Sequence, residues 1–392
     1  MTRAPIAFLD HPFHKKTKSS NFFIDILSKE FDVHVFYLEG DPREMMRELG
    51  DSNYETVICW QTEFCAPYFL MRGKRVVCVP MYDGVANAPD WYWLPMRQAR
   101  FVNFSRTLHQ RHRALGIESI YVKYFGTAKD HEQATFETLR GIFWQRRPQE
   151  GLDSRFARRV LGRVVDELHI HNAPDTEDAL EWEPQDDATV SYFTREGNTY
   201  REALKSSNVF LCPRRTEGIG HPLIEAMARG MCIVAHNLPT ANEYIVDGVN
   251  GILIDYDNPS SFEALSPRRL SNSRAEKLGK QARSTYLRGR NEWQKSENSL
   301  PYFVQTVPEP DFTEKDVSFA DRYLKISRYA HSDFYRYLHE LLNLQRSGLL
   351  GSEASSLSLR EIIKWRLIGV PGSRMAWRLT KRFGRRVRSV FR

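Results

Sequence analysis

The sequence predicts an α/β protein built from two doubly wound domains, with a helical extension at the C-terminal end. Short apolar runs rich in β-branched residues alternate with amphipathic runs, and this alternation occurs twice along the chain. Buried parallel strands that alternate with helices produce such a pattern. A length of 392 residues exceeds what one hydrophobic core supports and suits two domains of ordinary size.

The first set of alternations fills the N-terminal third of the chain. Strands are expected at 6–9, 33–38, 56–60 and 75–79, and helices at 20–27 and 42–49. Ser20 or Asn21 suits the cap of the first helix, and Pro42 suits the first turn of the second. This set predicts one Rossmann-like domain over 1–127.

The second set begins near Gly141. Strands are expected at 141–144, 168–171, 190–193, 208–211 and 232–235, and helices at 154–165, 199–206 and 222–229. Two such sets in succession predict two Rossmann-like domains that face a cleft, the second over 128–300. Residues 301–350 are expected to form a helical extension that packs back on the body, and 351–392 a linker and a basic amphipathic tail.

The charge and cysteine content restrict the class of protein. The net charge is +7, but residues 360–392 hold eleven Arg or Lys and one acidic residue, so the basic character belongs to the tail. The five cysteines have no metal-ligand spacing and lie in apolar stretches, which favours buried free thiols in a reducing compartment. No apolar run reaches 18 residues, so no membrane span is expected. These features predict a cytoplasmic protein.

One stretch, 208–226, carries most of the functional information. A strand ends at Cys212, a loop follows, and Pro222 suits the first turn of a helix. Gly218 and Gly220 let the loop backbone approach a ligand closely. Amide groups at the start of a helix attract anions, so the loop predicts a diphosphate site. Carboxylates at Glu217 and Glu225 suit hydrogen bonds from sugar and ribose hydroxyls, although either could also be a solvated surface group.

The same stretch resembles a known family. Glu217 and Glu225, with seven residues between them, resemble the E-x7-E signature of retaining GT-B glycosyltransferases of the family-4 type (glycosyl transferases group 1). The resemblance continues through 228–235 and through the loop and strand at 242–253, and it also covers 200–211 upstream. It is strong over about 200–295 and weak elsewhere.

The resemblance implies a GT-B fold and transfer of a sugar from a nucleoside-diphosphate sugar to an acceptor hydroxyl, with retention. It implies that Glu217 contacts the donor sugar and that Glu225 contacts the ribose, with Gly218, Ile219 and Gly220 lining the donor site. Arg146 matches the family's phosphate-binding arginine, but Glu150 stands where the family has a lysine.

Other side chains can complete the expected site. Three further arginines can replace the missing lysine as partners of the donor phosphates, or can lie free on the surface: Arg147, Arg214 and Arg215. Asp83 follows a strand and is expected either to face the reaction centre or to cap a loop. On the acceptor side, a histidine and three lysines follow the first strand, where they can meet a lipid diphosphate or an acidic glycan, or form a solvated loop: His11, Lys15, Lys16 and Lys18.

No metal site and no cofactor other than the donor substrate are expected, because no D-x-D motif follows an apolar strand.

The basic amphipathic segment Arg360–Arg392 is expected to bind an anionic membrane surface, at the inner face of the plasma membrane, where a glycan or lipid-linked acceptor would lie. Packing on the body, disorder and nucleic-acid binding are the alternatives for this tail, and no nucleic-acid fold accompanies it. We therefore predict a role in cell-surface polysaccharide or glycolipid assembly. The rival functions are a nucleotide-sugar epimerase of the same fold and a non-catalytic membrane-bound scaffold for glycan assembly.

Overall fold

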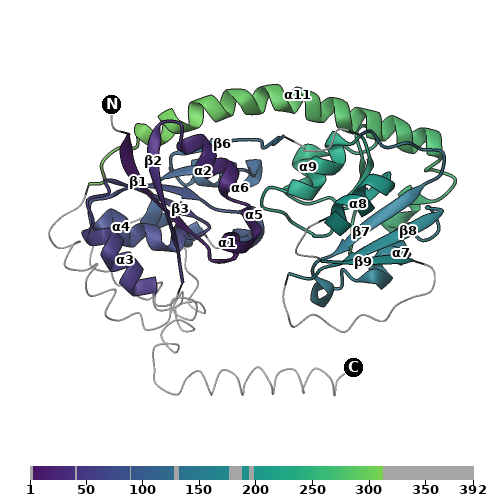
Figure 1. Ribbon diagram of the computed structural model, residues 1–392, viewed down its shortest axis with the longest axis horizontal. Coiled ribbons are helices and arrows are strands. Elements are labelled where there is room, and N and C mark those ends of the chain that lie inside the picture. The colour runs from purple at the N-terminus through teal and green to yellow at the C-terminus, as the bar shows by residue number, and fades with distance from the viewer. Residues whose placement is uncertain are drawn as a thin grey trace, which may run out of the picture.

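The computed structural model of the chain contains two parallel β-sheets joined by a long helix (Figure 1). The structure describes residues 3–39, 42–88, 90–127, 132–175, 188–193 and 198–311. Each sheet has six strands in the described part of the chain. Within the same residues, every helix is too short or too polar to span a bilayer.

The N-terminal sheet has the strand order β2-β1-β3-β4-β5-β6, and all its described pairs are parallel. Its strands are β1 (Ala4–Asp10), β2 (Phe31–Tyr37), β3 (Thr56–Trp60), β4 (Arg75–Val79), β5 (Arg100–Asn103) and β6 (Ser119–Tyr121). Its helices are α1 (Phe13–Thr17), α2 (Asn21–Leu27), α3 (Pro42–Asp51), α4 (Ala66–Met71), α5 (Tyr82–Val85) and α6 (Arg106–Ala114). Ile6 and Phe8 lie in one core and Ala7 and Leu9 in another, so both faces of the sheet are covered.

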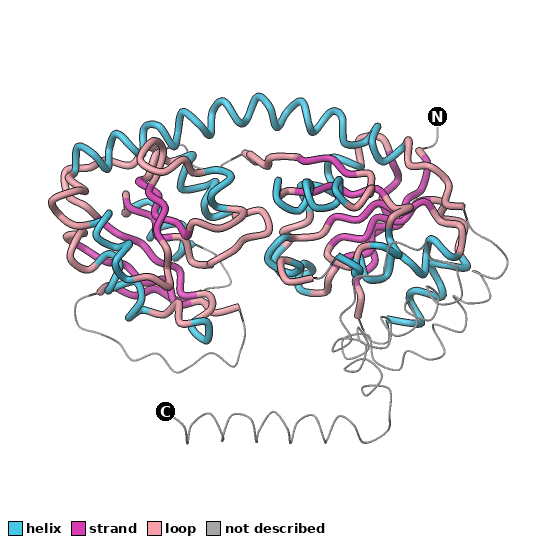
Figure 2. The backbone as a smooth tube through the Cα atoms, turned by 180° about the vertical axis from the view of Figure 1, so that it is seen from behind, coloured by secondary structure: helices cyan, strands magenta, loops and turns pink. Residues whose placement is uncertain are grey.

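The C-terminal sheet has the order β12-β11-β10-β7-β8-β9, again parallel. Figure 2 shows the strands of the two sheets as separate groups below the long helix. Its strands are β7 (Arg140–Gln145), β8 (Glu167–Asn172), β9 (Thr189–Tyr192), β10 (Val209–Leu211), β11 (Cys232–His236) and β12 (Ile252–Ile254). Its helices are α7 (Ser154–Leu161), α8 (Asn198–Ser206), α9 (His221–Ala228) and α10 (Ala241–Tyr244). In parallel sheets of this kind, ligands bind beyond the carboxyl ends of the strands.

A single helix, α11 (Asn272–Gln305), crosses both sheets, as Figure 1 shows. Ser271 caps its start by accepting a hydrogen bond from the amide of Arg274. Glycines allow close packing along its length, because a Cβ on Gly279 would lie 2.0 Å from the carbonyl oxygen of Gly230. Further along, Trp293 packs its ring against Tyr124, with 4.8 Å between ring centroids. The helix therefore packs against the C-terminal domain at its beginning and against the N-terminal domain near its end.

The elements match the sequence analysis in part. The strands expected at 56–60 and 75–79 are present with those bounds, and the five cysteines are confirmed as free and buried. The helix expected at 154–165 ends at Leu161, where Gly162 forms its cap. β5 and β6 were not predicted, and the expected division at residue 300 falls inside α11. Most of the expected extension over 301–350, and all of 351–392, lies outside the described residues.

The packing of α11 predicts that Gly279→Ala destabilises the protein, although alanine is the better helix former by roughly 1 kcal/mol. The added methyl group would displace the backbone of Gly230, which is typical of overpacking at a cost of about 1–3 kcal/mol. Thermal unfolding of the variant should therefore begin at a lower temperature than that of the wild type. Gly84→Ala is the control, because a Cβ there meets nothing within 4 Å. Equal stability of all three proteins would contradict the packing described here.

Candidate active site

The loop between β10 and α9 has the geometry that its sequence predicts. Strand β10 ends at Leu211, and α9 begins at His221 after Gly220, which adopts the left-handed φ of 76° at the cap position. Thr240 holds the loop in place by donating a hydrogen bond from its Oγ1 atom to the carbonyl oxygen of Glu217, at 2.7 Å. The first turn of a helix has amide N–H groups without intrahelical partners, so this loop ends at a position that is electrostatically suited to an anion.

The loop also touches the N-terminal domain. A Cβ on Gly218 would lie 2.9 Å from Cβ of Met81 and 3.0 Å from Oδ1 of Asp83. Only glycine fits at this position without movement of its neighbours. A close approach by a ligand was expected at this glycine and stays a prediction, whereas the structure shows that it permits the close approach of the two domains.

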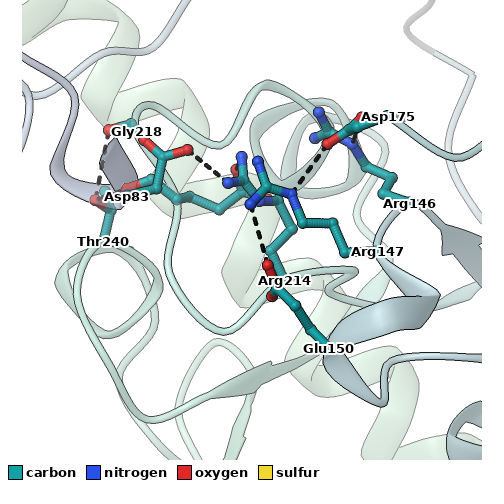
Figure 3. A network of polar contacts seen from close by, with 9 residues as sticks. Asp83, Arg146, Arg147, Glu150, Asp175, Arg214, Gly218 and Thr240 are labelled. Carbon is teal, nitrogen blue, oxygen red and sulfur yellow. Dashed lines mark hydrogen bonds and ion pairs between the residues drawn. The ribbon is translucent and has the colours of Figure 1, made fainter. Parts of the chain in front are cut away.

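Arg214 joins the two domains through an ion pair. Its guanidinium lies 2.6 Å from Oδ2 of Asp83 in α5 and 3.5 Å from Oε2 of Glu217, as Figure 3 shows for the first of these contacts. The side chains of Arg214, Glu217 and Asp83 are 9%, 9% and 16% exposed. Burial lowers the pKa of Arg214, but the carboxylates of Glu217 and Asp83 more than offset it, so the guanidinium stays charged. The structure thus brings together two carboxylates that lie far apart in the sequence.

Glu217 is a carboxylate in a largely dry environment. Burial raises its pKa, and the positive charges of Arg214 and Arg146 oppose that shift without cancelling it. Asp83 and Asp175 add a further upward contribution because like charges disfavour ionisation. A carboxyl group whose pKa is perturbed by burial, beside a second carboxyl and a cation, is typical of functional sites.

A second group of charges lies after β7. Asp175 accepts hydrogen bonds from Nε of Arg146 at 3.0 Å and from Nε of Arg147 at 3.3 Å, and its own amide donates to the carbonyl of Arg146 (Figure 3). The guanidinium of Arg146 also stacks on the ring of Trp144, at 4.8 Å from the centroid. Asp175 therefore fixes the direction of both arginines, a role that the sequence analysis did not assign to it.

Glu150, at the position where a lysine was expected, pairs with Arg147 at 3.1 Å (Figure 3). Its carbonyl oxygen accepts a hydrogen bond from Arg215, whose guanidinium also pairs with Asp257 at 2.6 Å. Each of the four arginines considered for the diphosphate therefore contacts a carboxylate in this structure. None of them is a free surface arginine.

One group of side chains in the described residues could hold a metal ion, namely His236, Asp255 and Asp257. Asp257 is already paired with Arg215, and Nδ1 of His236 lies within hydrogen-bonding distance of the Ile254 carbonyl and the Tyr256 amide. These contacts leave the group poorly suited to a cation, and the expectation of a metal-independent site stays a prediction.

The remaining predicted residues lie on α9, in the loop before it, and in or next to α1. Glu225 is exposed on α9, one turn from its start, and Ile219 is buried in the loop. On the acceptor side, Lys15 pairs with Glu39 at 3.1 Å, whereas the ammonium of Lys16 lies 5.6 Å from the ring centroid of Phe193 in the other domain. Helix α1 contains Lys15 and Lys16, and His11 lies two residues before its start. Lys18 is the C-cap of this helix and has a left-handed backbone conformation.

Glu243 forms a second contact between the domains. Its carboxylate accepts hydrogen bonds from Oγ of Ser105 at 2.9 Å and from the amides of Arg106 at 2.6 Å and Thr107 at 3.2 Å. It therefore caps the start of α6 from the opposite domain, where a negative charge is favourable. The sequence analysis placed Glu243 within a family-like loop but assigned it no contact, because nothing local in the sequence indicates a partner 137 residues away.

The raised pKa of Glu217 gives a pH-dependent prediction. A carboxyl group whose pKa is higher in the folded state is stabilised there in its protonated form. Its contribution to the free energy of unfolding is complete below the pKa of the unfolded chain, about 4.3, and is lost as the pH rises through the pKa of the folded state. Glu217→Gln should therefore unfold at a higher temperature than the wild type at about pH 7.5, and the difference should shrink near pH 4.5. Glu202→Gln, an exposed carboxylate on α8, is the control. A Glu217→Gln protein that is less stable at pH 7.5 would show that the pair with Arg214 outweighs desolvation.

Comparison with known proteins shows a similarity within the C-terminal domain. Residues 178–285 match the family described as glycosyl transferases group 1. The alpha-maltose-1-phosphate synthase of Mycobacterium tuberculosis is 39% identical over 57 residues, which are 14% of this chain and 15% of that protein. The similarity at the level of sequence thus covers a small part of the relative's own length.

Solved structures show the similarity of the whole fold. The sucrose-phosphate synthase from Thermosynechococcus elongatus has a TM-score of 0.58 at 12% identity, and the match covers 78% of this chain and all of that one. HepE of Anabaena, in complex with UDP and glucose, has a TM-score of 0.52 at 11% identity, with 76% of this chain and 100% of that one covered. The predicted two-domain α/β fold is confirmed. Residues 178–285 thus resemble the glycosyl transferases group 1 family, and the chain has the two-domain GT-B fold of these solved structures.

Proposed function

We propose that the chain is a glycosyltransferase that moves a sugar from a nucleoside-diphosphate sugar to an acceptor hydroxyl, with retention of the anomeric configuration. The observation that carries this proposal is the loop 213–220, which leads from β10 to the start of α9 and contacts Asp83 of the other domain. The family match at 178–285 includes this loop. Retention follows from the family resemblance, and the anomeric configuration of the product, read by NMR, tests it.

The donor diphosphate would lie against the start of α9. Amide groups there and the guanidinium groups of Arg146, Arg147 and Arg214 would stabilise the negative charge that grows on the leaving diphosphate, which is the main term in catalysis of this kind. Glu217 would orient the donor sugar through its hydroxyls. Asp83 would hold Arg214 from the acceptor side of the site.

Glu225 would bind the ribose. It is exposed on the first turns of α9 and therefore open to a ligand that reaches the helix from the loop. Its carboxylate can accept hydrogen bonds from two neighbouring hydroxyls, and such charged hydrogen bonds are the stronger kind. No metal ion has a part in this arrangement.

One observation favours a second candidate function, a non-catalytic glycan-binding scaffold. Glu150 stands in place of a lysine, and Arg146, Arg147 and Arg214 already contact carboxylates. A diphosphate would have to compete with those carboxylates for the guanidinium groups. A scaffold would bind nucleotides weakly or not at all.

We further propose that Arg360–Arg392 binds the anionic inner face of the plasma membrane and brings the enzyme to a glycan or lipid-linked acceptor. Apolar residues recur there every three or four positions, and basic residues fill the other faces. Each basic residue near such a surface contributes roughly 1 kcal/mol of attraction. The segment lies outside the described residues, so this proposal rests on the sequence.

A thermal-shift screen tests the donor site. UDP, GDP, dTDP, ADP and CMP would be added in buffer that contains EDTA, because the proposed site needs no metal. Free ligand at about 100 times its dissociation constant stabilises the folded protein by roughly 2.7 kcal/mol, so one nucleoside diphosphate should raise the melting temperature. Glu225→Ala should abolish the shift, and Glu202→Ala, an exposed glutamate on α8, should keep it.

Three outcomes of the screen would count against the proposal. No shift with any nucleotide would favour the scaffold. A shift that Glu225→Ala retains in full would remove the ribose role of that residue. A shift that appears only with added magnesium would overturn the metal-independent site.

Liposome flotation tests the membrane proposal. The full chain and a chain that ends at residue 356 would be mixed with vesicles of neutral lipid or of neutral lipid with phosphatidylserine. The full chain should float with the anionic vesicles and lose that association as salt increases, because salt screens the attraction. Equal flotation of the two proteins would reject a membrane role for the tail.

A further inference from the structure

Tyr200 on helix α8 lies near the carboxyl end of the C-terminal sheet. Its ring centroid is 4.8 Å from that of Trp144 on β7 and 5.3 Å from that of His171 on β8. Trp144 and His171 are partners in the parallel register of these strands, and each lies one residue before the end of its strand. Their side chains therefore share one face of the sheet. Because ligands of such sheets bind beyond the carboxyl ends of the strands, Tyr200 lies at the edge of the binding region.

The same face of the sheet leads to the proposed donor site. The guanidinium of Arg146 stacks on the ring of Trp144, so this ring contacts both Arg146 and Tyr200. Helices α8 and α9 (Figure 1) contribute to one hydrophobic core, in which Leu204 and Ile224 are buried and against which Tyr200 packs. Direct contacts thus connect Tyr200 to a proposed phosphate-binding arginine and to the core beneath α9.

The hydroxyl group of Tyr200 is buried, and no residue that the structure describes forms a hydrogen bond with it. Trp144 offers no acceptor, because its only polar atom, Nε1, already donates to the carbonyl oxygen of Ala173 at 2.8 Å. Burial raises the pKa of Tyr200 well above its usual value, and the negative charge of Glu225 raises it further, so the hydroxyl keeps its proton. A buried O–H group without an acceptor lowers stability, which points to an acceptor that a ligand supplies.

The surrounding charges indicate which part of a ligand the hydroxyl meets. Glu225 raises the pKa of Tyr200 and Arg146 lowers it, and these are the two charges that act most strongly on this group. In the proposed donor site, Glu225 binds the ribose and Arg146 the diphosphate. The phosphate attached to the ribose joins these two parts of the donor. Its oxygens are anionic acceptors, which form the stronger kind of hydrogen bond.

We propose that Tyr200 is a donor-binding residue, whose buried hydroxyl donates a hydrogen bond to the phosphate group attached to the ribose. This inference rests on the proposed glycosyltransferase function and adds a residue to its donor site. The rings of Trp144 and His171 hold the phenol in place, so the hydroxyl is oriented before the nucleotide arrives. Nucleotides with a 5′-phosphate can make this contact and nucleosides cannot, so Tyr200 contributes to the distinction between them.

Tyr200→Phe tests the proposal, because it removes the hydroxyl and keeps the ring. NMR titration would give the affinities of the wild type and the variant for UDP, GDP and ADP, each with its monophosphate and its nucleoside. In the series whose base the site accepts, the variant should bind the diphosphate and the monophosphate roughly tenfold more weakly, the effect of one lost hydrogen bond to a charged acceptor. Its affinity for the nucleoside should be unchanged, whereas a general disturbance of the site would weaken all three ligands.

Melting temperatures without nucleotide provide an independent measurement. Tyr200→Phe should unfold at the temperature of the wild type or above it, because it removes a buried polar group that has no partner. Tyr256→Phe should unfold at a lower temperature, since the hydroxyl of Tyr256 donates a hydrogen bond to the carbonyl oxygen of Cys212 at 2.8 Å. Tyr54→Phe is the control for binding and should keep the wild-type affinities, because the hydroxyl of Tyr54 contacts His34 in the N-terminal domain.

Two results would overturn the inference while the proposed function stands. The first is a wild type that binds nucleotide and a Tyr200→Phe protein whose affinities are unchanged, or are weakened equally for nucleotides and nucleoside. The second is a Tyr200→Phe protein that melts well below the wild type, which would show that the hydroxyl has a partner within the protein. A wild type that binds none of the nucleotides would instead remove the proposed function and this inference together.

Discussion

A guanidinium buried between carboxylates from two domains is the constraint on which the rest of the site depends. Arg214 is 9% exposed, and a charge at that depth is costly unless carboxylates lie beside it. Asp83 supplies one carboxylate from the N-terminal domain and Glu217 the other from the loop before α9. The same pairing brings Met81 into close contact with Gly218. The contacts that hold the loop therefore also hold the two sheets in their relative position.

The same charges define what a donor would meet. Arg146, Arg147 and Arg214 supply the positive charge, but Asp175, Glu150 and Asp83 already contact them. When a diphosphate binds, the guanidinium groups would exchange their carboxylate partners for phosphate oxygens. The carboxylates would already have set the orientation of these groups before the diphosphate arrives. Orientation in advance of binding is what electrostatic stabilisation of a transition state requires. The raised pKa of Glu217 shows that this arrangement is obtained at some cost in stability.

Local patterns in the sequence predicted the strands, the loop 213–220 and α9, because β-branched runs, glycines and Pro222 act over a few residues. The ion pairs could not be predicted in this way, since Asp83 and Arg214 are 131 residues apart and Asp175 lies 29 residues from Arg146. Helix α11 was not predicted, because its packing face alternates between two domains and includes Gly279, Gly289 and Pro301. Helix α1 was also not predicted, because its five residues are too few to give a helical pattern.

The proposed donor site places the diphosphate of a nucleotide against the loop 213–220 and the start of α9. A crystal structure in complex with a nucleoside diphosphate tests this most directly. We expect phosphate oxygens at the backbone amides of Gly218–His221 and within reach of Arg146 or Arg214, with the ribose hydroxyls on Glu225. A nucleotide bound elsewhere, or a diphosphate at this loop with the ribose directed away from Glu225, would contradict it.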